Sequence, residues 1–242
     1  MALKETGRNR KPMRLPSIFF IIVASLALTA GRAEAQVIVD PNFSTPSYNP
    51  GNVEYSPGVT GWTFNSASSP QNNGGTGIAG YESGFGDPFP SPGPPSGSQY
   101  AFLQGGAGGP ESFYQQGIAF PAGSFTISFY DAASSNADPF QVTLENAQDD
   151  IQTLTFGGDT TLSPGNSLFE LQTSDPFLES AGTYTLSFTG EGGSTSDRSF
   201  IDGVQVNAVP EPANWIAPLL AIVGGLFVVK RRNAPNRLLT QK

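Results

Sequence analysis

The residues Ala122-Gly-Ser-Phe-Thr-Ile-Ser-Phe129 alternate between apolar and polar side chains, and Ala181-Gly-Thr-Tyr-Thr-Leu-Ser-Phe188 repeats this pattern. A period of two residues is typical of a β-strand with one buried face and one solvated face. We therefore expect the larger side chains of both stretches to point into a core: Phe125, Ile127, Phe129, Tyr184, Leu186 and Phe188. The intervening Thr and Ser side chains are expected on the opposite face.

The same period continues through residues 36–208, where Gly, Pro, Asn and Ser separate the segments. This pattern predicts an all-β domain of about ten strands. The expected strands are residues 37–39, 59–64, 99–104, 112–120, 124–130, 140–146, 151–156, 167–172, 183–189 and 200–207. Residues 66–77 and 83–98 are rich in Ser, Asn, Gly and Pro, and they are expected to form long surface loops.

The repeated stretch also indicates how the strands are organised. Each copy is followed by a second strand, which ends at Asn146-Ala147 after the first copy and at Asn207-Ala208 after the second. A solenoid would need three or more such units. Two related antiparallel units favour a single antiparallel β-sandwich of jelly-roll type.

The N-terminal residues 1–35 have the pattern of a signal peptide. Five basic residues precede an apolar run over residues 18–30, and Ala33-Glu34-Ala35 supplies the small-x-small pattern that signal peptidase recognises. The n-region holds no adjacent arginine pair, so the general secretory route is expected. We predict a mature chain that begins at Gln36.

The C-terminal region contains three segments in a fixed order. Residues 209–214 form a linker with Pro210-Glu211-Pro212, which neither a helix nor a strand can run through. Residues 215–229 carry no charge and predict a transmembrane helix, although fifteen residues span only roughly 22 Å of a ~30 Å hydrocarbon core. Residues 230–242 begin with the basic cluster Lys230, Arg231 and Arg232. This cluster predicts a cytoplasmic tail, with the β-domain outside the membrane.

The order of these segments resembles the PEP-CTERM sorting tail of bacterial exported proteins. The resemblance implies that an exosortase-type membrane peptidase recognises the tail at the inner membrane and cuts near the motif. The domain would then reach the cell surface or an extracellular polysaccharide matrix. Ten residues follow the basic cluster, where such tails usually stop almost at once. An ordinary single-pass anchor behind a Pro-rich linker remains the alternative.

Composition excludes several kinds of site. The chain has no Cys and no His, so it can form neither a disulfide nor a catalytic triad that uses imidazole. Residues 36–212 contain eighteen Asp or Glu residues and a single basic residue, Arg198. Such an acidic domain should repel nucleic acid, anionic lipids and anionic glycans. Neutral sugars and divalent cations are better candidate partners. The alternative is that the acidity serves only to keep a secreted protein soluble.

Several scattered segments resemble the landmarks of galactose-binding-like jelly-roll domains. They are Asp40-Pro-Asn-Phe43, Gly61-Trp62, Ser96-Gly-Ser-Gln-Tyr-Ala-Phe-Leu103, Ala122 to Phe129 and Ile201-Asp-Gly-Val204. In carbohydrate-binding members of this group, an early Glu and a late Asp often surround a structural calcium ion. Here Ser44 stands at the position of the Glu, and Asp202 matches the late Asp. The resemblance therefore implies a calcium site at Asp202 with half of its usual acidic ligands.

Four aromatic residues are candidates for glycan binding. The indole of Trp62 could stack on the apolar face of a sugar ring, although a strand Trp beside Gly is more often a core residue. Tyr81, Phe85 and Phe89 lie in or beside the Gly/Pro-rich loop, where little sheet is available to bury them. They are predicted to form an exposed binding rim.

Acidic residues offer no catalytic pattern. Asp149-Asp150 lies between two expected strands and is typical of a turn. Asp131, Asn136 and Asp138 share a loop that could hold calcium, but they lack the Asp-x-Asp-x-Asp-Gly spacing. We therefore expect no enzymatic activity. Two functions remain open: an exported surface or matrix protein with a structural or adhesive role, and a carbohydrate-binding module for neutral glycans.

Overall fold

The computed structural model describes residues 37–58, 61–65, 74–85, 93–134, 136–165 and 168–210. They belong to one compact unit, residues 33–210. The predicted signal peptide with its cleavage site, the tail from Glu211 onward and Phe89 all lie outside the described residues. Over the described ranges, no helix has the length and apolar character needed to cross a membrane.

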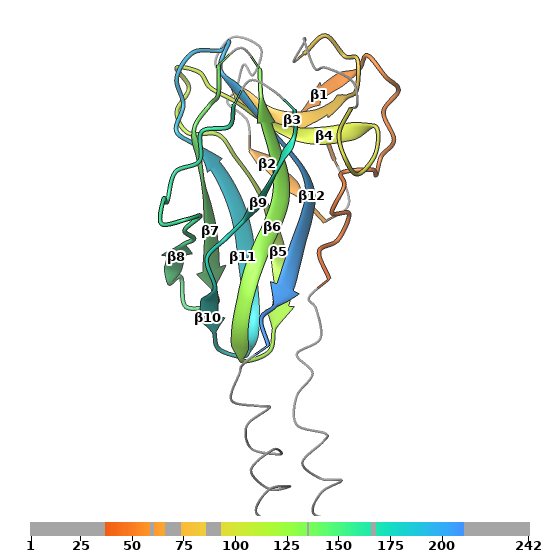
Figure 1. Ribbon diagram of the computed structural model, residues 1–242. Helices are drawn as coiled ribbons and strands as arrows, with labels where there is room; N and C mark the ends of the chain where they lie inside the picture. Colours follow the sequence, from red (N-terminus) through yellow and green to blue (C-terminus); the bar gives the residue numbers. More distant parts are fainter. Residues whose placement is uncertain are drawn as a thin grey trace, which may run out of the picture. The chain divides into compact units, whose positions relative to one another are not determined.

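Within the described residues, the strands form two antiparallel sheets, arranged as two layers (Figure 1). The first sheet has seven strands in the order β1-β3-β4-β12-β6-β10, and β9 also pairs with β6. Its strands are β1 (Val53–Tyr55), β3 (Gly75–Gly80), β4 (Gln99–Gln104), β6 (Gly123–Ala133), β9 (Glu170–Thr173), β10 (Phe177–Glu179) and β12 (Arg198–Ala208). The second sheet has the order β2-β5-β11-β7-β8. Its strands are β2 (Thr63–Asn65), β5 (Ser112–Phe120), β7 (Phe140–Asn146), β8 (Ile151–Thr153) and β11 (Gly182–Gly190). This arrangement confirms an all-β sandwich, and its jelly-roll type remains a prediction.

The two copies of the repeated stretch lie in different sheets. The first copy is β6 and is followed by β7, and the second copy is β11 and is followed by β12. The pairing is crossed, because β6 pairs with β12 in the first sheet and β11 pairs with β7 in the second. Each unit therefore contributes one strand to each sheet, and neither unit can form its sheet pairing alone.

The core lies between the sheets, as the alternation predicts. The six expected side chains are all buried, with at most 4% of their surface exposed. Phe188 of β11 stacks on Phe113 of β5 at 4.9 Å between ring centres, and Phe129 of β6 meets Phe188 edge to face at 5.1 Å. Such ring contacts add about 0.5–1.5 kcal/mol each beyond area burial. The packing of Phe129 on Phe188 joins the two repeated stretches across the sandwich.

A second apolar cluster lies on the other face of the first sheet. Its buried members alternate along their strands with core residues: Ala79, Tyr100, Phe102, Ala132 and Phe200. Half-buried side chains, including Tyr55 and Phe169, pack against this cluster, which we call the outer cluster. The first sheet is therefore buried on both faces where β3 and β4 lie.

The structure corrects several predicted strands. Val37–Val39 is not a strand, because the side-chain amide of Gln115 bonds both the N–H and the C=O of Val39 at 2.9 and 2.8 Å and takes the place of a strand partner. The strand predicted over residues 59–64 is described only from Thr63 to Asn65. Strands β1 and β10 were not expected, and β3 includes residues that were assigned to a surface loop.

The glycine-rich sequence of β3 has a steric cause. A Cβ added to Gly77 would lie 2.0 Å from the carbonyl oxygen of Glu54 in β1 and 2.8 Å from the Phe102 ring. Only glycine allows this approach of β1 and of the outer cluster. The residues that make β3 look like a loop are therefore required for its place in the sheet.

Candidate functional site

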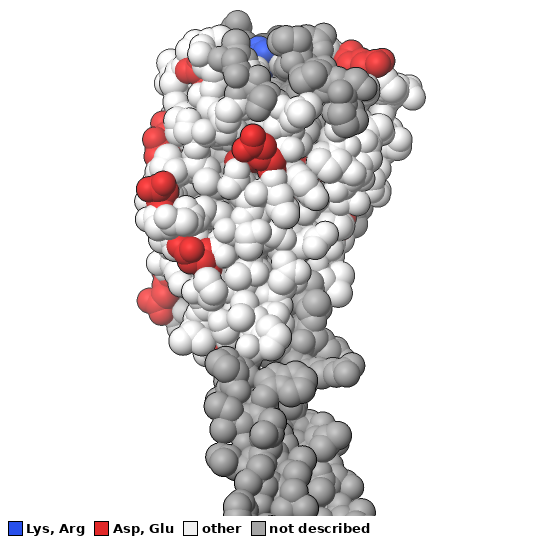
Figure 2. Space-filling model, in the orientation of Figure 1, with Lys and Arg blue, Asp and Glu red and all other residues white. Residues whose placement is uncertain are grey.

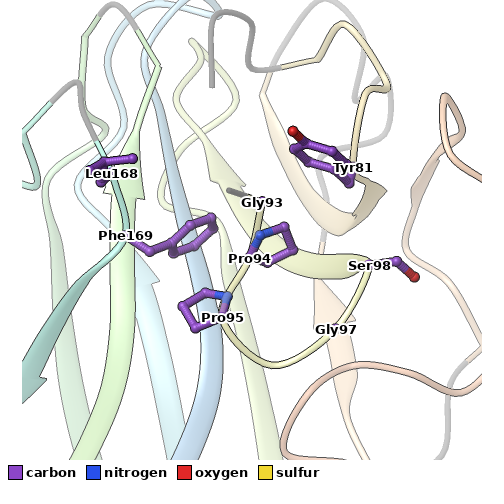
Figure 3. Close-up of a pocket in the computed structure, with 8 residues that line it drawn as sticks. All are labelled: Tyr81, Gly93, Pro94, Pro95, Gly97, Ser98, Leu168 and Phe169. Carbon is purple, nitrogen blue, oxygen red and sulfur yellow. The ribbon is translucent and has the colours of Figure 1, made fainter. Parts of the chain in front are cut away.

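An open pocket of about 560 Å³ lies beside the outer cluster (Figure 3). Three segments line it: the residue after β3, the loop before β4 and the two residues before β9. The lining residues are Tyr81, Gly93, Pro94, Pro95, Gly97, Ser98, Leu168 and Phe169. None of these described lining residues carries a charge.

Two aromatic rings stand on different sides of the prolines in this pocket (Figure 3). The Tyr81 ring packs on the backbone of Gly93, since a Cβ added there would lie 2.7 Å from Tyr81 Cδ2. Phe169 packs on Tyr100 of the outer cluster at 5.9 Å between ring centres. Both rings are half-buried, so each has one side held by the protein and another available to a ligand.

The loop that carries the prolines is fixed by Asp202 of β12. The Asp202 carboxylate is fully buried and accepts hydrogen bonds of 2.8 Å from the backbone N–H groups of Ser96 and Gly203. Burial raises the pKa of Asp202 to about 6, and these hydrogen bonds oppose the rise. Gly203 has a φ of +64°, and a Cβ there would lie 2.7 Å from Ser96 Oγ. The close approach of loop and strand thus depends on a glycine.

The structure places the predicted site residues in different surroundings. Tyr81 lines the pocket and is half-buried. Phe85 lies 4.4 Å from Phe102 between ring centres and packs on the outer cluster. Phe169 was expected only as a strand residue, and nothing in its sequence context indicates that it meets Tyr81 at a pocket.

Trp62 is a correction to the sequence prediction. Its side chain is 3% exposed and lies in the core, 5.1 Å from Phe43 and 5.5 Å from Phe113 between ring centres. The indole Nε1 donates a hydrogen bond of 3.1 Å to the carbonyl oxygen of Asp40. Both faces are therefore unavailable for stacking on a sugar.

No group of three or more acidic side chains arranged for a metal ion occurs among the described residues. Asp202 uses one carboxylate oxygen for Ser96 and the other for Gly203, so its visible role is to hold the loop. The calcium ion expected at Asp202 rests on the sequence resemblance alone.

No family model matches this chain, and no curated protein matches it. Among solved structures, a Stig cyclase from Fischerella sp. TAU, bound to a pyrrolidinylidene-indole compound, is similar with a TM-score of 0.55 and 14% identity. The match covers 74% of this chain and 98% of the cyclase. At this identity the similarity shows a shared fold and nothing about activity.

Two carbohydrate-binding structures are similar at lower scores. The xylan-binding CBM22-1 domain of Xyn10C from Paenibacillus barcinonensis matches with a TM-score of 0.42 and 14% identity, over 68% of this chain and 99% of that domain. The structure of TmCBM61 with β-1,4-galactotriose matches with a TM-score of 0.39 and 13% identity, over 74% of this chain and all of that module. These scores are too low to support a functional argument.

Proposed function

We propose that this chain is an exported, non-catalytic surface or extracellular-matrix protein whose β-sandwich binds neutral carbohydrate at the pocket between Tyr81 and Phe169. The observation that carries the proposal is the pair of half-buried aromatic rings in an open, uncharged pocket. Aromatic faces bind the apolar faces of sugar rings, and a Gly/Pro loop leaves backbone groups accessible to hydroxyls. This function would make the role in the matrix adhesive rather than only structural.

The distribution of charge favours a neutral ligand. Acidic side chains are spread over the visible face of the domain and are separated by uncharged surface (Figure 2). A polyanionic glycan would meet repulsion from many directions, and only one basic residue lies between residues 36 and 212. A neutral hexose or pentose polymer would bind at the uncharged pocket without this cost.

The export part of the proposal rests on the two ends of the sequence. Signal peptidase would cut before Gln36, and an exosortase-type peptidase would process the tail around Pro210, Glu211 and Pro212. Fractionation of cells that have this peptidase should find the domain at the surface or in the matrix. Full-length protein that stays in the inner membrane of such cells would disprove the sorting step.

Carbohydrate binding is tested with a glycan array and residues 36–210, which lie within the compact unit. We expect binding to neutral glycans, and Tyr81→Ala and Phe169→Ala should each weaken it by about 3- to 10-fold. Leu178→Ala is the matched control, because Leu178 is 75% exposed on β10 and does not line the pocket. Its affinity should equal that of the unchanged domain.

Two outcomes would overturn the binding proposal. One is that the domain binds none of the neutral glycans on the array, which would favour a purely structural role in the matrix. The other is binding that both aromatic substitutions leave unchanged, because the ligand would then lie elsewhere on the domain. Circular dichroism of each variant checks that the β-sandwich is intact.

A further inference from the structure

Two buried carboxylates lie away from the pocket, at Glu111 and Asp138. Glu111 directly precedes β5, and Asp138 lies in the connection between β6 and β7. Their exposed fractions are 2% and 0%, and all four carboxylate oxygens lack a hydrogen-bond partner within the described part of the chain. An unpaired buried carboxylate is costly, so two of them together call for a compensating group.

The two carboxylates face a common space beside Gly190. A Cβ added to Gly190 would lie 2.5 Å from Asp138 Oδ2 and 3.2 Å from Glu111 Oε2. On the other side of Glu111, a Cβ added to Gly74 would lie 2.3 Å from Oε1 and 2.6 Å from the carbonyl oxygen of Gln104. The two glycines thus allow carboxylate oxygens to approach the main chain more closely than any larger residue would permit.

The backbone around this pair is held in place. Gly190 donates a hydrogen bond of 2.8 Å to the carbonyl oxygen of Glu111, and Ser199 Oγ donates one of 2.6 Å to the carbonyl oxygen of Asp138. These bonds hold the main chain of Glu111 and Asp138 against β11 and β12.

The surroundings of the pair disfavour the charged form of both carboxyls in the absence of a cation. Burial raises the pKa of Asp138 to about 8, and the nearby Glu111 carboxylate adds to this rise. The N–H group of Gly192 opposes the rise, but no hydrogen bond of ordinary geometry joins it to Asp138. Burial also raises the pKa of Glu111 to about 7. Arg198 supplies no counter-charge, because its guanidinium lies over the Phe85 ring.

We propose that Glu111 and Asp138 bind one calcium ion in the space between Gly74 and Gly190. The available ligands are oxygens, which suit a hard cation, and the chain has no Cys or His for a softer metal. The carbonyl oxygen of Gln104 is placed to add a ligand, and water would complete the six to eight that calcium takes. With two carboxylate ligands, we expect a calcium dissociation constant of about 10⁻⁴ to 10⁻³ M, the range found for extracellular calcium-binding modules.

The ion would join the ends of both sheets. Gly74 and Gln104 belong to the β3 and β4 end of the first sheet, whereas Glu111 leads into β5 of the second. Asp138 lies where the chain passes from β6 in the first sheet to β7 in the second. Calcium would therefore stabilise the sandwich at a place where the sequence provides no disulfide.

The test measures thermal unfolding of residues 36–210 at pH 7.5 with EDTA or with 10 mM calcium chloride. Calcium should raise the Tm by about 3–10 °C, given the expected dissociation constant and the size of the domain. Glu111→Gln and Asp138→Asn should each remove this rise, because an amide keeps the shape and loses the charge. Asp150→Asn is the control in an exposed turn and should keep the full rise.

Three outcomes would overturn the proposal. They are no Tm rise in the unchanged domain, a rise that both variants keep, and a rise that Asp202→Asn alone removes. If a variant does not fold, amide hydrogen exchange of the unchanged domain is measured with and without calcium instead. Calcium should slow exchange around Gly190 and in the residues that flank Glu111 and Asp138. Slower exchange confined to other parts of the domain would contradict the site.

Discussion

The guanidinium carbon of Arg198 lies 4.3 Å from the centre of the Phe85 ring, and Nη1 donates a hydrogen bond of 2.6 Å to the carbonyl oxygen of Phe85. The contact joins the turn after β3 to the first residue of β12. The Phe85 ring in turn packs on Tyr55 at 5.9 Å and Phe102 at 4.4 Å between ring centres. The single basic side chain of the domain is thus half-buried and used for structure.

This contact predicts resistance to trypsin. Arg198 provides the one tryptic site between residues 36 and 210, and its backbone N–H donates a hydrogen bond of 2.9 Å to the carbonyl oxygen of Asn136 in the connection between β6 and β7. We expect the native domain to stay intact, whereas Phe85→Ala should speed cleavage and yield a fragment that begins at Ser199. Gel electrophoresis and mass spectrometry check this. Rapid cleavage of the unchanged domain would show that the start of β12 is not docked.

The buried carboxyls predict how stability depends on pH in EDTA. The folded state raises the pKa of Glu111 to about 7 and of Asp138 to about 8, above ordinary values near 4 for the unfolded chain. Between these values the folded state holds more protons than the unfolded state. The free energy of unfolding should therefore fall as pH rises from about 4 to about 8. Urea unfolding across this range measures it, and Asp138→Asn should flatten the profile.

Gly77→Ala is predicted to destabilise the domain by about 1–3 kcal/mol or more, because its Cβ would overlap the carbonyl oxygen of Glu54. Gly58→Ala is the matched control, since a Cβ there meets nothing within 4 Å. Urea unfolding should separate the two variants clearly. Equal stability of the two would mean that β1 and β3 do not approach as described.

Asp202→Ala is predicted to cost about 1–3 kcal/mol, because it leaves the buried N–H groups of Ser96 and Gly203 without an acceptor. It should also weaken glycan binding, although Asp202 does not line the pocket. Glu170→Ala, an exposed carboxylate on β9, should change stability little. An unchanged affinity in Asp202→Ala would show that the loop keeps its position without this anchor.

The strands with clear alternation were predictable from the sequence. Residues 140–146 form a strand with the expected bounds, since Phe140, Val142 and Leu144 recur every second residue. Residues 99–104 and 112–120 also form strands with the expected bounds, although their apolar side chains do not alternate strictly. Strand β3 was not predicted, because its glycines have no side chains that could show the alternation. These glycines are needed because β1 packs closely against β3. The local sequence pattern cannot reveal a requirement that comes from another strand.

The sites were harder to predict for a related reason. Tyr81 could be singled out because it lies beside a Gly/Pro loop, but its partner Phe169 is about ninety residues away and resembles an ordinary strand residue. Nothing in the sequence indicates that Glu111 is buried, because an acidic residue before a strand usually faces water. Its burial follows from how β5, β11 and the β6–β7 connection pack, which only the assembled sandwich determines.

Strand β12 is the last of the domain, and it lies between β4 and β6. Without it, the first sheet would consist of β1, β3 and β4 on one side and β6 with β9 and β10 on the other. A chain that emerges from its N-terminus therefore cannot close its core until the final 11 residues of the domain have followed. The export that we propose by the general secretory route would carry the chain across the membrane unfolded. This strand order would then delay folding until translocation of the domain is almost complete.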